Sequence, residues 1–350
     1  MPELNVVTGG ADSGASSPLA AAQKAVAGGP PGIGGLEQAA STVQGGCPEL
    51  AAILRSTAVR TELELCLRQE AAAAEQQRRL MREATAANVC LMLAGVLSGL
   101  VLVGAASRDA IDAAWGGAIT NDTVLALGTA TLALGALAAM FGHIARDQDR
   151  LGRWLARRAS AELARLTAFR AIAGEAAARG PEVAMYGLAV IARHLLHEQR
   201  AWLGARAAQH RRSSEWTSIW GGVATALAFI GGSGAVIGGF EPGKAWVAIA
   251  GVIGAAVAAY AANREALRRD RTNADRYEKT QAVLDGLAAR DDTIAAEIAS
   301  GKPDALVAFT EAVAEPLAAE HKAWLEDSAQ AQSALAKLDS RLQELRGGAN

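Results

Sequence analysis

The chain has 350 residues, of which 51% are hydrophobic and only 4% aromatic, with Ala and Gly supplying most of the bulk. The formal net charge of −2 implies no bulk attraction to nucleic acid, so nucleic acid is not an expected partner. Three cysteines, Cys47, Cys66 and Cys90, lack metal-like spacing and fit a reduced, cytoplasm-facing context better than a disulfide framework. Small residues let helix backbones approach closely, as they do in membrane helix bundles.

Residues 1–45 are rich in Gly, Ala, Ser and Pro, and this composition predicts a mostly disordered first segment. The segment lacks the basic start and apolar core of a signal peptide, so insertion is expected from the first internal helix. Within it, residues 6–14 (VVTGGADSG) form an apolar run that feeds a Gly-rich turn. Such a turn places backbone amides around a phosphate if a helix follows, but no complete α/β domain fits into 45 residues.

Four stretches contain no Asp, Glu, Lys or Arg, and a helix needs roughly 20 such residues to cross a bilayer. The first three stretches are long enough with some tilt, and the fourth is at the short end. We therefore expect an all-α membrane protein with four transmembrane helices in two hairpins. The alternative, a buried helical hairpin in a soluble bundle, is disfavoured by four separate runs of this length. The four stretches are Ala84–Ser107, Thr123–Ala145, Trp216–Phe240 and Ala245–Asn263.

The charges that flank these stretches predict their orientation, because cytoplasmic loops carry an excess of Lys and Arg. The two hairpin loops carry only Arg108 and Lys244 as basic residues, so the arginine-rich sides and both termini are expected on the cytoplasmic side of the membrane. Trp115, Trp216, Trp220 and Trp246 lie near the ends of the stretches, where indole rings settle at headgroup level. The flanking arginines are Arg78, Arg79, Arg82, Arg146, Arg150, Arg153, Arg157, Arg158, Arg206, Arg211, Arg212, Arg264, Arg268, Arg269 and Arg271.

The two halves of the chain repeat at an offset of 122 residues. This offset places Thr123 on Ala245 and Pro181 on Pro303, and it aligns the segment Glu198–Leu203 (EQRAWL) with Glu320–Leu325 (EHKAWL). Because an even number of crossings separates the halves, both units have the same orientation, which disfavours an inverted-repeat transporter. We expect a first unit at residues 46–210 and a second at 211–350, each with long cytoplasmic amphipathic helices.

Beyond Trp324, apolar or small residues recur at alternating four- and three-residue spacing, which suits a short coiled coil. This seam either joins subunits into a homo-oligomer or packs against other helices of the same chain. Its members are Ser328, Ala331, Leu335, Leu338, Leu342 and Leu345.

Little in the sequence points to catalysis, because no Ser/His/Asp grouping, pair of catalytic carboxylates or Walker-type loop occurs in it. We expect neither an enzyme nor a cofactor. His194, His197 and Glu198 are interpreted as the solvated or interfacial face of an amphipathic helix, so no metal site is expected. The four stretches contain no ionisable group for a transporter or proton relay, apart from the interfacial His143.

The candidate functional residues are therefore positions of helix packing and the repeated motif. Gly95 and Gly99, like Gly234 and Gly238, place small residues one turn apart on one helix face and permit close crossing. Five hydroxyl-bearing residues would provide polar groups at membrane depth if ions passed between the helices. They are Ser98, Thr129, Thr131, Thr225 and Ser233. The motif residues singled out are Glu198, Trp202, Glu320 and Trp324.

Over roughly residues 50–346 this arrangement resembles the SLATT superfamily, the two-transmembrane effector domains associated with SMODS nucleotidyltransferases and SLOG sensors. The resemblance rests on the basic-flanked hairpins and on the helices that end at Glu198–Leu203 and Glu320–Leu325, and it looks like two units in tandem. Residues 6–14 are similar to the T-G-G-x-x-[ST]-G loop of TRPM-like SLOG domains, and Ala21 to Ile33 continue that pattern, with Gly28–Ile33 in place of a final strand.

The resemblance implies an antiviral effector of a bacterial conflict system, which oligomerises and forms a pore in the inner membrane on a cytoplasmic signal. Its implied partners are the lipid bilayer, further copies of the chain, and a cytoplasmic sensor or nucleotide-signal protein. Because no charged residue lies at membrane depth, a path would use the hydroxyl-bearing faces or a dewetting gate. The alternative is a non-conducting membrane scaffold that docks a signalling partner; a small-solute transporter is a third reading.

Overall fold

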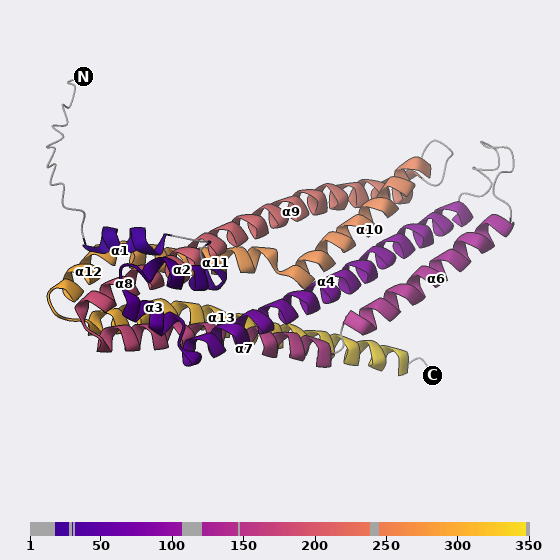
Figure 1. Cartoon of the computed structure of the whole chain (residues 1–350). Coiled ribbons are helices and arrows are strands. Elements are labelled where there is room, and N and C mark those ends of the chain that lie inside the picture. Colours follow the sequence, from indigo (N-terminus) through magenta and orange to yellow (C-terminus); the bar gives the residue numbers. More distant parts are fainter. Residues whose placement is uncertain are drawn as a thin grey trace, which may run out of the picture. The chain divides into compact units, whose positions relative to one another are not determined.

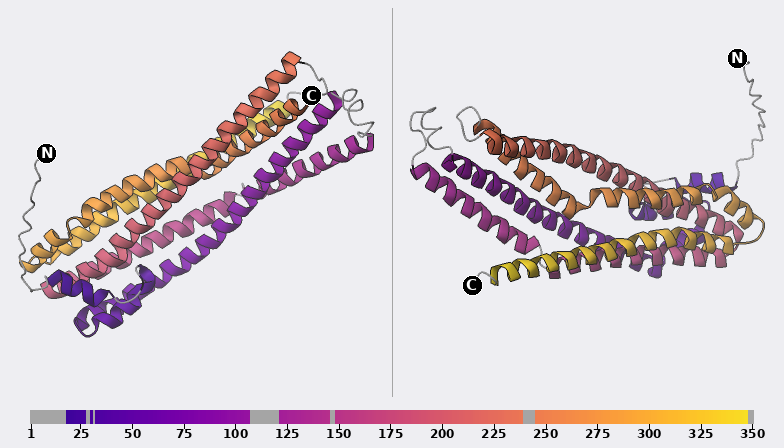
Figure 2. Two further views of the ribbon diagram at one scale, coloured as in Figure 1. Left: turned by 90° about the horizontal axis from the view of Figure 1, so that it is seen from above. Right: turned by 180° about the vertical axis from the view of Figure 1, so that it is seen from behind.

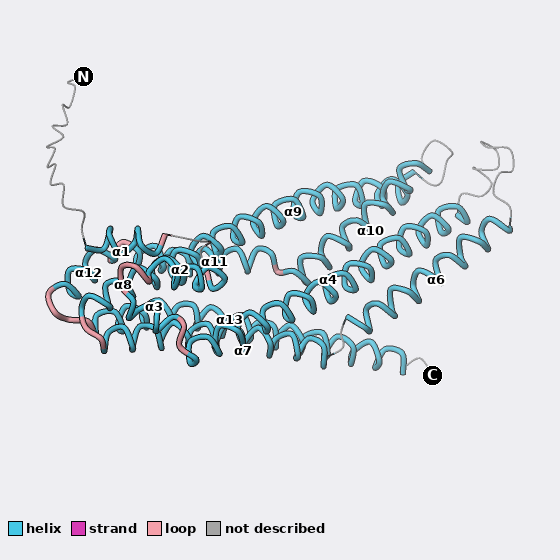
Figure 3. The backbone as a smooth tube through the Cα atoms, viewed as in Figure 1, coloured by secondary structure: helices cyan, strands magenta, loops and turns pink. Residues whose placement is uncertain are grey.

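The computed structural model describes residues 18–27, 30, 32–106, 121–145, 148–238 and 245–347. The ordered elements in these ranges are helices, and they contain no strand (Figure 3), which confirms the all-helical class. In chain order and as labelled in Figure 1, they are α1 Pro18–Val26, η1 Ile33–Gly35, α2 Leu36–Val43, α3 Pro48–Leu54, α4 Thr57–Ala106, α6 Asn121–Ala145, α7 Gln148–Ala178, α8 Pro181–Ile191, η2 Ala192–His197, α9 Glu198–Gly238, α10 Ala245–Arg268, α11 Asp270–Ala288, α12 Asp291–Ala299 and α13 Asp304–Gly347.

The chain divides into two compact units, and five long helices, α4, α7, α9, α11 and α13, contribute residues to both. Unit 1 comprises Met1–Glu64, Ala164–Arg200 and Val283–Pro316. Unit 2 comprises Leu65–Leu163, Ala201–Ala282 and Leu317–Asn350. The boundary between sequence units that was expected at residues 210 and 211 therefore differs from the spatial division, because each spatial unit draws on both halves of the chain.

Unit 1 is built around α8, whose sequence PEVAMYGLAVI is apolar on nearly every face and is largely buried. Pro181 occupies the first turn of this helix, directly after Gly180, whose φ of 106° is a conformation that glycine adopts freely. Gly187 permits close packing in the core, since a Cβ built on it would lie 2.9 Å from Leu306 of α13 and 3.0 Å from Ala176 of α7. Ion pairing adds to this contact, as Arg170 donates two hydrogen bonds, of 2.7 and 2.8 Å, to the Glu311 carboxylate.

The expectation of a mostly disordered segment at residues 1–45 is wrong for its described part. Leu19, Ala22 and Val26 recur at helical spacing in α1 and are buried, and α2 buries Leu36, Ala39, Ala40 and Val43. The Gly- and Pro-rich composition obscured this short apolar periodicity. In the proposed SLOG-like continuation, residues 21–26 are α-helical and Ile33 begins a 3₁₀ turn, whereas residues 28, 29 and 31 lie outside the described ranges. Residues 6–14 lie outside the described ranges.

Unit 1 contains the two histidines that were interpreted as part of a solvated or interfacial helix face, and for His194 this interpretation is wrong because the side chain is buried. His194 is fully buried in the π-helical turn η2, and its Nδ1 donates to the carbonyl of Gly32 at 2.8 Å. Burial lowers the pKa of His194, which keeps the imidazole neutral at physiological pH. His197 instead faces Asp291 at 3.5 Å. The two rings therefore have separate partners within the protein.

Unit 2 contains the apolar helices, and α9 and α10 lie side by side as an antiparallel hairpin (Figures 1 and 2). A Cβ built on Gly231 would lie 2.2 Å from the Cα of Gly251, and one built on Gly254 would lie 2.6 Å from the carbonyl oxygen of Ala224. Backbone contact as close as this requires glycine at all of these crossing points.

Helix α4 packs antiparallel to α10 in the same unit. A Cβ added at Gly99 would lie 2.1 Å from Val252, and one added at Gly95 would lie 3.7 Å from Ala256. Farther along, Asn88 donates to the carbonyl of Tyr260 at 3.4 Å and accepts from the side chain of Asn263 at 3.2 Å. The predicted packing role of Gly95 and Gly99 therefore coincides with a helix contact.

Two stretches among the described residues are long and apolar enough to cross a membrane, Thr57–Gly104 and Trp246–Ala299, and the apolar helix Leu125–Phe141 is shorter. The stretch Thr57–Gly104 contains most of the first predicted transmembrane stretch, Leu125–Phe141 most of the second, and Trp246–Ala299 most of the fourth. The third stretch lies in α9 up to Gly238 and continues into residues 239–244, which are not described. Also outside the described residues lie Arg108, Trp115 and Arg146, the hairpin-loop residue Lys244, and the side chains of the predicted coiled-coil seam.

Candidate functional site

The boundary between α10 and α11 is a bend at a single residue. Apolar α10 ends at Arg268 and charged α11 begins at Asp270. Arg269 between them has a φ of 49°, in the left-handed region that a residue with a Cβ adopts at a cost of about 1–2 kcal/mol. Its amide still donates to the carbonyl of Glu265 at 2.7 Å, and its carbonyl accepts from the amide of Asn273 at 2.9 Å. The backbone bonding thus runs through the bend while the helix axis is interrupted.

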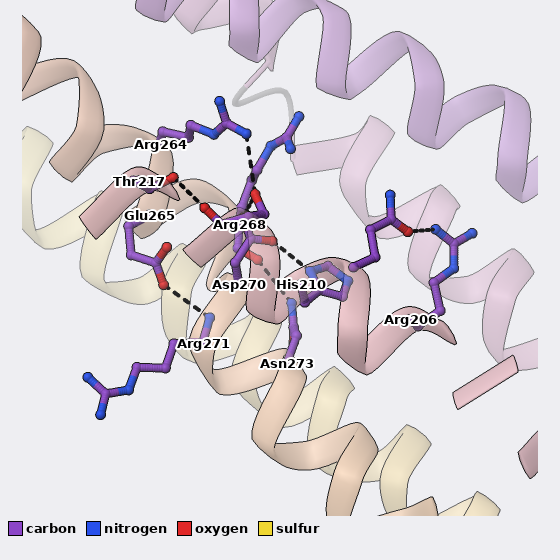
Figure 4. Close-up of polar contacts among 11 residues, drawn as sticks. Arg206, His210, Thr217, Arg264, Glu265, Arg268, Asp270, Arg271 and Asn273 are labelled. Carbon is purple, nitrogen blue, oxygen red and sulfur yellow. Dashed lines mark hydrogen bonds and ion pairs between the residues drawn. The ribbon is translucent and has the colours of Figure 1, made fainter. Parts of the chain in front are cut away.

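A buried carboxylate fixes this bend to α9. Asp270 is 2% exposed, and its two oxygens accept hydrogen bonds of 2.6 Å each from Nδ1 of His210 and from the hydroxyl of Ser213 (Figure 4). The same hydroxyl accepts from the guanidinium of Arg264, on α10, at 3.3 Å. We call these four residues the junction site; they tie α9 to the end of α10 and to the start of α11.

The backbone groups left open by the bend are also satisfied. The side-chain amide of Asn273 donates to the carbonyl of Arg268 at 2.9 Å, and the Glu265 carboxylate accepts from the amide of Arg271 at 3.2 Å (Figure 4). Helix ends leave such donors and acceptors without intrahelical partners. The bend is therefore a built feature of the fold rather than a frayed helix end.

The charge state of Asp270 follows from its surroundings. Burial opposes ionisation, but the hydrogen bonds from His210 and Ser213, with the positive charges of His210 and Arg268, outweigh it and lower the pKa of Asp270. The carboxylate is therefore ionised at physiological pH. An ionised, hydrogen-bonded carboxylate at 2% exposure holds its partners more strongly than a neutral group would.

The first motif tryptophan packs beside the junction site. Trp202 meets Tyr277 of α11 edge-on, with ring centroids 5.7 Å apart, and the guanidinium of Arg206 lies 5.7 Å from the Trp202 ring. His210 lies 5.6 Å from the same Tyr277 ring, which links the aromatic contact to the junction site. The first turns of α11 therefore pack on α9 through one continuous set of side chains.

The second motif tryptophan lies in a different contact, between α13 and α7. Trp324 meets Trp154 edge-on at 4.9 Å, with Arg158 4.5 Å above its ring, and Ala73 of α4 completes the buried cluster. Next to Trp324, the Oε1 of Glu320 and both ring nitrogens of His321 are buried and have no hydrogen-bond partner in the described part of the chain. We call Trp154, Trp324, Glu320 and His321 the tryptophan site.

Burial dominates both titratable groups of the tryptophan site. It raises the pKa of Glu320, although Arg158 and Arg276 oppose the effect. It lowers the pKa of His321, with the positive charge of Arg158 acting in the same direction. Both shifts favour the neutral side chain, as expected where a charge would be buried without a hydrogen-bonded partner.

Comparison with known families decides the assignment of this region. Residues 192–324 match the model of SLATT_1, described as the SMODS and SLOG-associating 2TM effector domain 1. Over these residues the chain is similar to the SLATT family. No curated protein and no solved structure matches the chain.

The SLATT domain, as matched, contains both motif tryptophans, the α9–α10 hairpin and the whole junction site. It begins at Ala192, ahead of the boundary at 211 expected for the second unit, because the helix that enters the hairpin starts well before the apolar stretch. Its two-transmembrane description agrees with the apolar helices of the chain and indicates a membrane protein. The match does not extend to the first half, so the tandem arrangement and the TRPM-like fragment stay predictions.

Three glycines that pack the SLATT hairpin were not singled out by the sequence, and the packing role of Gly234 and Gly238 stays a prediction. Gly231, Gly251 and Gly254 make the closest approaches, whereas the surroundings of Gly234 and Gly238 lie outside the described side chains. A search for glycines four residues apart on one helix finds Gly234 and Gly238. Gly231 and Gly251 meet across two helices, and neither belongs to a pair of glycines spaced four residues apart, so this search does not find them.

Four of the five predicted path residues are exposed on unit 2, and the fifth, Thr131, is half-buried. Ser98, Thr129, Thr225 and Ser233 are all exposed. The hydroxyls of Thr129, Thr225 and Ser233 donate to the carbonyl four residues earlier, at 2.8, 2.7 and 2.6 Å. Such bonds satisfy the hydroxyl within its own helix, which lowers the cost of placing it in an apolar environment.

Glu198 and Arg200 of the first motif belong neither to the junction site nor to the tryptophan site. Glu198 accepts a hydrogen bond from the neighbouring Gln199 at 2.8 Å. Arg200 of the same motif pairs with Asp285 at 2.6 Å. No group of three or more His, Cys, Asp or Glu side chains suited to a metal ion occurs among the described residues.

Proposed function

We propose that the chain is a membrane effector of a bacterial conflict system that opens a path for ions when its cytoplasmic helices receive a signal. The observation that carries this proposal is the junction site inside the SLATT domain. It joins an apolar hairpin to a charged helix through one buried carboxylate and one left-handed residue. A displacement of α11 is thereby passed to α10 instead of being absorbed by a loose loop.

The proposed topology has four crossings, by α4, α6, α9 and α10, with both termini in the cytoplasm. It is supported by the four stretches free of Asp, Glu, Lys and Arg and by the arginines at one end of each hairpin. Exposed apolar side chains on the described parts of α6 and α9 agree with a lipid or subunit contact; they include Leu125, Leu132, Phe229 and Ile230.

The proposal of two SLATT-like units in tandem is supported by the positions at which helices begin. Helices α7 and α11 start at Gln148 and Asp270, which differ by the same 122 residues as the motifs. Helices α8 and α13 start at Pro181 and Asp304, each shortly after a glycine with positive φ. In addition, each motif tryptophan packs on the helix that follows the other hairpin.

The mechanism follows from the close glycine contacts. Helix pairs that touch through glycine backbones can slide or rotate with little change in side-chain packing. A signal that moves α11 would turn α10 against α9 at Gly231 and Gly251, and against α4 at Gly99. Because the hydroxyl-bearing residues are exposed on unit 2, a path lined by them forms between copies of the chain, which requires a homo-oligomer.

The test is ion leakage from liposomes that contain the purified full chain. Gly231→Leu places a large side chain against Gly251 and is expected to abolish leakage. Gly232→Leu is the matched control, since a Cβ there would meet nothing within 4 Å, and it is expected to leak like the wild type. Equal leakage from both variants would contradict a path that depends on α9–α10 packing.

The same assay distinguishes the non-conducting scaffold. Liposomes that stay tight with and without candidate nucleotides and cytoplasmic proteins, together with harmless overexpression and an intact membrane potential, would favour the scaffold. In that case the junction site would transmit a signal between the membrane hairpin and a docked cytoplasmic protein without conduction. A cytoplasmic sensor or nucleotide-signal protein is the proposed partner under either function.

A further inference from the structure

A pocket in unit 2 lies where α4 meets the end of α10. Helix α4 contributes Met81, Ala84, Thr85 and Asn88 to its wall, and α10 contributes Tyr260, Arg264 and Arg268. It is adjacent to the junction site, because Arg264 belongs to both. Neither the SLATT match nor the proposed ion path assigns a role to this pocket.

Two features of the pocket point to an anionic ligand. Its charged side chains are both arginines, and among the described residues neither forms an ion pair with a carboxylate. The Nε of Arg264 is buried and has no hydrogen-bond partner there, although its Nη2 donates to Ser213 at 3.3 Å. A buried guanidinium N–H without an acceptor is costly, so an acceptor supplied by a ligand would be strongly favoured.

The chemistry of the wall narrows the ligand class. The planar guanidinium forms bidentate hydrogen bonds with phosphate oxygens, and Thr85 and Asn88 add short polar groups beside the arginines. Met81, Ala84 and Tyr260 supply an apolar side that a free inorganic ion does not need. We infer that this pocket binds a phosphate group, and that the apolar side accommodates the glycerol and upper acyl chain of an anionic phospholipid.

The position along the chain favours the lipid as the source of the phosphate. Under the proposed topology, residues 81–88 and 260–268 lie at the arginine-rich cytoplasmic end of the apolar helices, at headgroup level. Basic pockets between membrane helices on this side are known sites for anionic headgroups. This step rests on the proposed topology, whereas phosphate binding itself does not.

Occupancy of the pocket would act on the bend. Arg264 donates to Ser213, which in turn donates to the buried Asp270 carboxylate. A phosphate that accepts from the guanidinium of Arg264 fixes this side chain and hence the junction site. The lipid is therefore expected to hold α10 and α11 in the arrangement seen here.

The test measures lipid binding to the full chain in a neutral detergent by native mass spectrometry, with phosphatidylglycerol and phosphatidylcholine as probes. The double variant Arg264→Gln/Arg268→Gln is expected to weaken phosphatidylglycerol binding by roughly 25-fold, from about fivefold for each arginine. The matched control, Arg212→Gln/Arg271→Gln, removes two exposed arginines from the same end of the hairpin and is expected to change binding by less than about threefold. Arg268→Gln alone leaves the hydrogen bond from Arg264 to Ser213 intact. This single variant tests the pocket if the double variant does not fold.

A second arm adds inorganic phosphate and pyrophosphate to identify the source of the phosphate. Selective binding of phosphatidylglycerol that millimolar phosphate does not displace supports a lipid site. Displacement by phosphate or pyrophosphate supports a phosphate site that serves a soluble ligand. Equal losses in the pocket and control variants, or no preference for phosphatidylglycerol and no phosphate binding, would overturn the inference. Since no conductance is measured, a failed leakage assay leaves these outcomes distinct.

Discussion

Trp202 and Trp324 occupy the same place in the repeated motif, yet the buried carboxyl groups near them, Asp270 and Glu320, differ in how they are satisfied. Beside Trp202, the buried Asp270 receives hydrogen bonds from His210 and Ser213. Beside Trp324, Glu320 and His321 are buried with polar atoms that have no partner in the described part of the chain. Each buried polar group left without a hydrogen bond costs about 1–3 kcal/mol.

This difference indicates that the junction site and the tryptophan site have different roles. The junction site holds α9, α10 and α11 together and suits the transmission of a movement. At the tryptophan site, aromatic packing is the main stabilising contact, and the buried polar groups without hydrogen bonds oppose it. Separating α13 from α7 there should therefore cost less free energy than breaking the junction site. We therefore expect a cytoplasmic signal to act first on α13 at the tryptophan site.

The largest expected effect comes from removing the aromatic packing that offsets this penalty. Trp324→Ala should destabilise the α13–α7 contact by about 3–5 kcal/mol, the usual cost of truncating a buried tryptophan, because Trp324 is only 8% exposed. Thermal melting in detergent, together with faster hydrogen exchange in residues 317–326, measures it. Trp202→Ala is the control, with a smaller loss because Trp202 is partly exposed. Equal losses at both tryptophans would remove the distinction between the sites.

The next effect tests the junction site. Asp270→Asn removes the charge that His210 and Ser213 hydrogen-bond and should cost about 2–3 kcal/mol, because bonds to an ionised group are the stronger ones. Asp275→Asn, on the same helix but at an exposed ion pair with Arg211, should cost less than about 1 kcal/mol. Thermal midpoints of the two variants in detergent decide between these values.

The pH dependence of this effect has a definite sign. Because the pKa of Asp270 in the folded chain lies below its ordinary value of 3.8, its stabilisation is complete above pH 3.8 and is lost as the pH falls through the folded pKa. The Asp270→Asn variant lacks this acid-dependent loss. A variant that melts as the wild type does at neutral pH would show that the junction site does not depend on the carboxylate.

At the tryptophan site, the same reasoning predicts stabilisation. The pKa of Glu320 is raised above its ordinary 4.5 by burial, so stability is lost as the pH rises from 4.5 through the folded pKa. Glu320→Gln removes this loss and should stabilise the chain at neutral pH by on the order of 1 kcal/mol. Glu326→Gln, at an exposed position on the same helix, should change nothing. A lower melting temperature for Glu320→Gln at pH 7.5 would mean that the carboxylate is paired in the folded protein.

The sequence predicts those features that depend on local composition. Runs without charge locate the apolar part of α4 and most of α10. The motif marks Trp202 and Trp324 as special. These signals are contained in contiguous stretches, where hydropathy and spacing are directly readable.

The features that escape the sequence depend on contacts between distant residues. Trp154, Tyr277 and Asp270 have no local signal, because their roles arise from partners 170, 75 and 60 positions away, namely Trp324, Trp202 and His210. The meeting of Gly231 with Gly251 depends on how two helices align after the hairpin turns. A left-handed arginine at position 269 is likewise a consequence of tertiary structure, since nothing about Arg favours that conformation.

The smallest expected effect separates buried from exposed pairing on the same two helices. Arg211 of α9 donates to the Glu278 carboxylate of α11 at 2.8 and 2.6 Å. Arg211 directly follows His210 and Glu278 lies eight residues after Asp270, but both side chains of this pair are more than 40% exposed. Arg211→Gln should therefore cost only about 0.5 kcal/mol, and less at high salt, because water and ions screen an exposed pair. Melting temperatures of the variant and the wild type, compared at about 50 mM and about 500 mM salt, measure this loss and its dependence on screening. If Arg211→Gln were as damaging as Asp270→Asn, α11 would be held to α9 by its whole charged face, and the junction site would not be the point at which movement is transmitted.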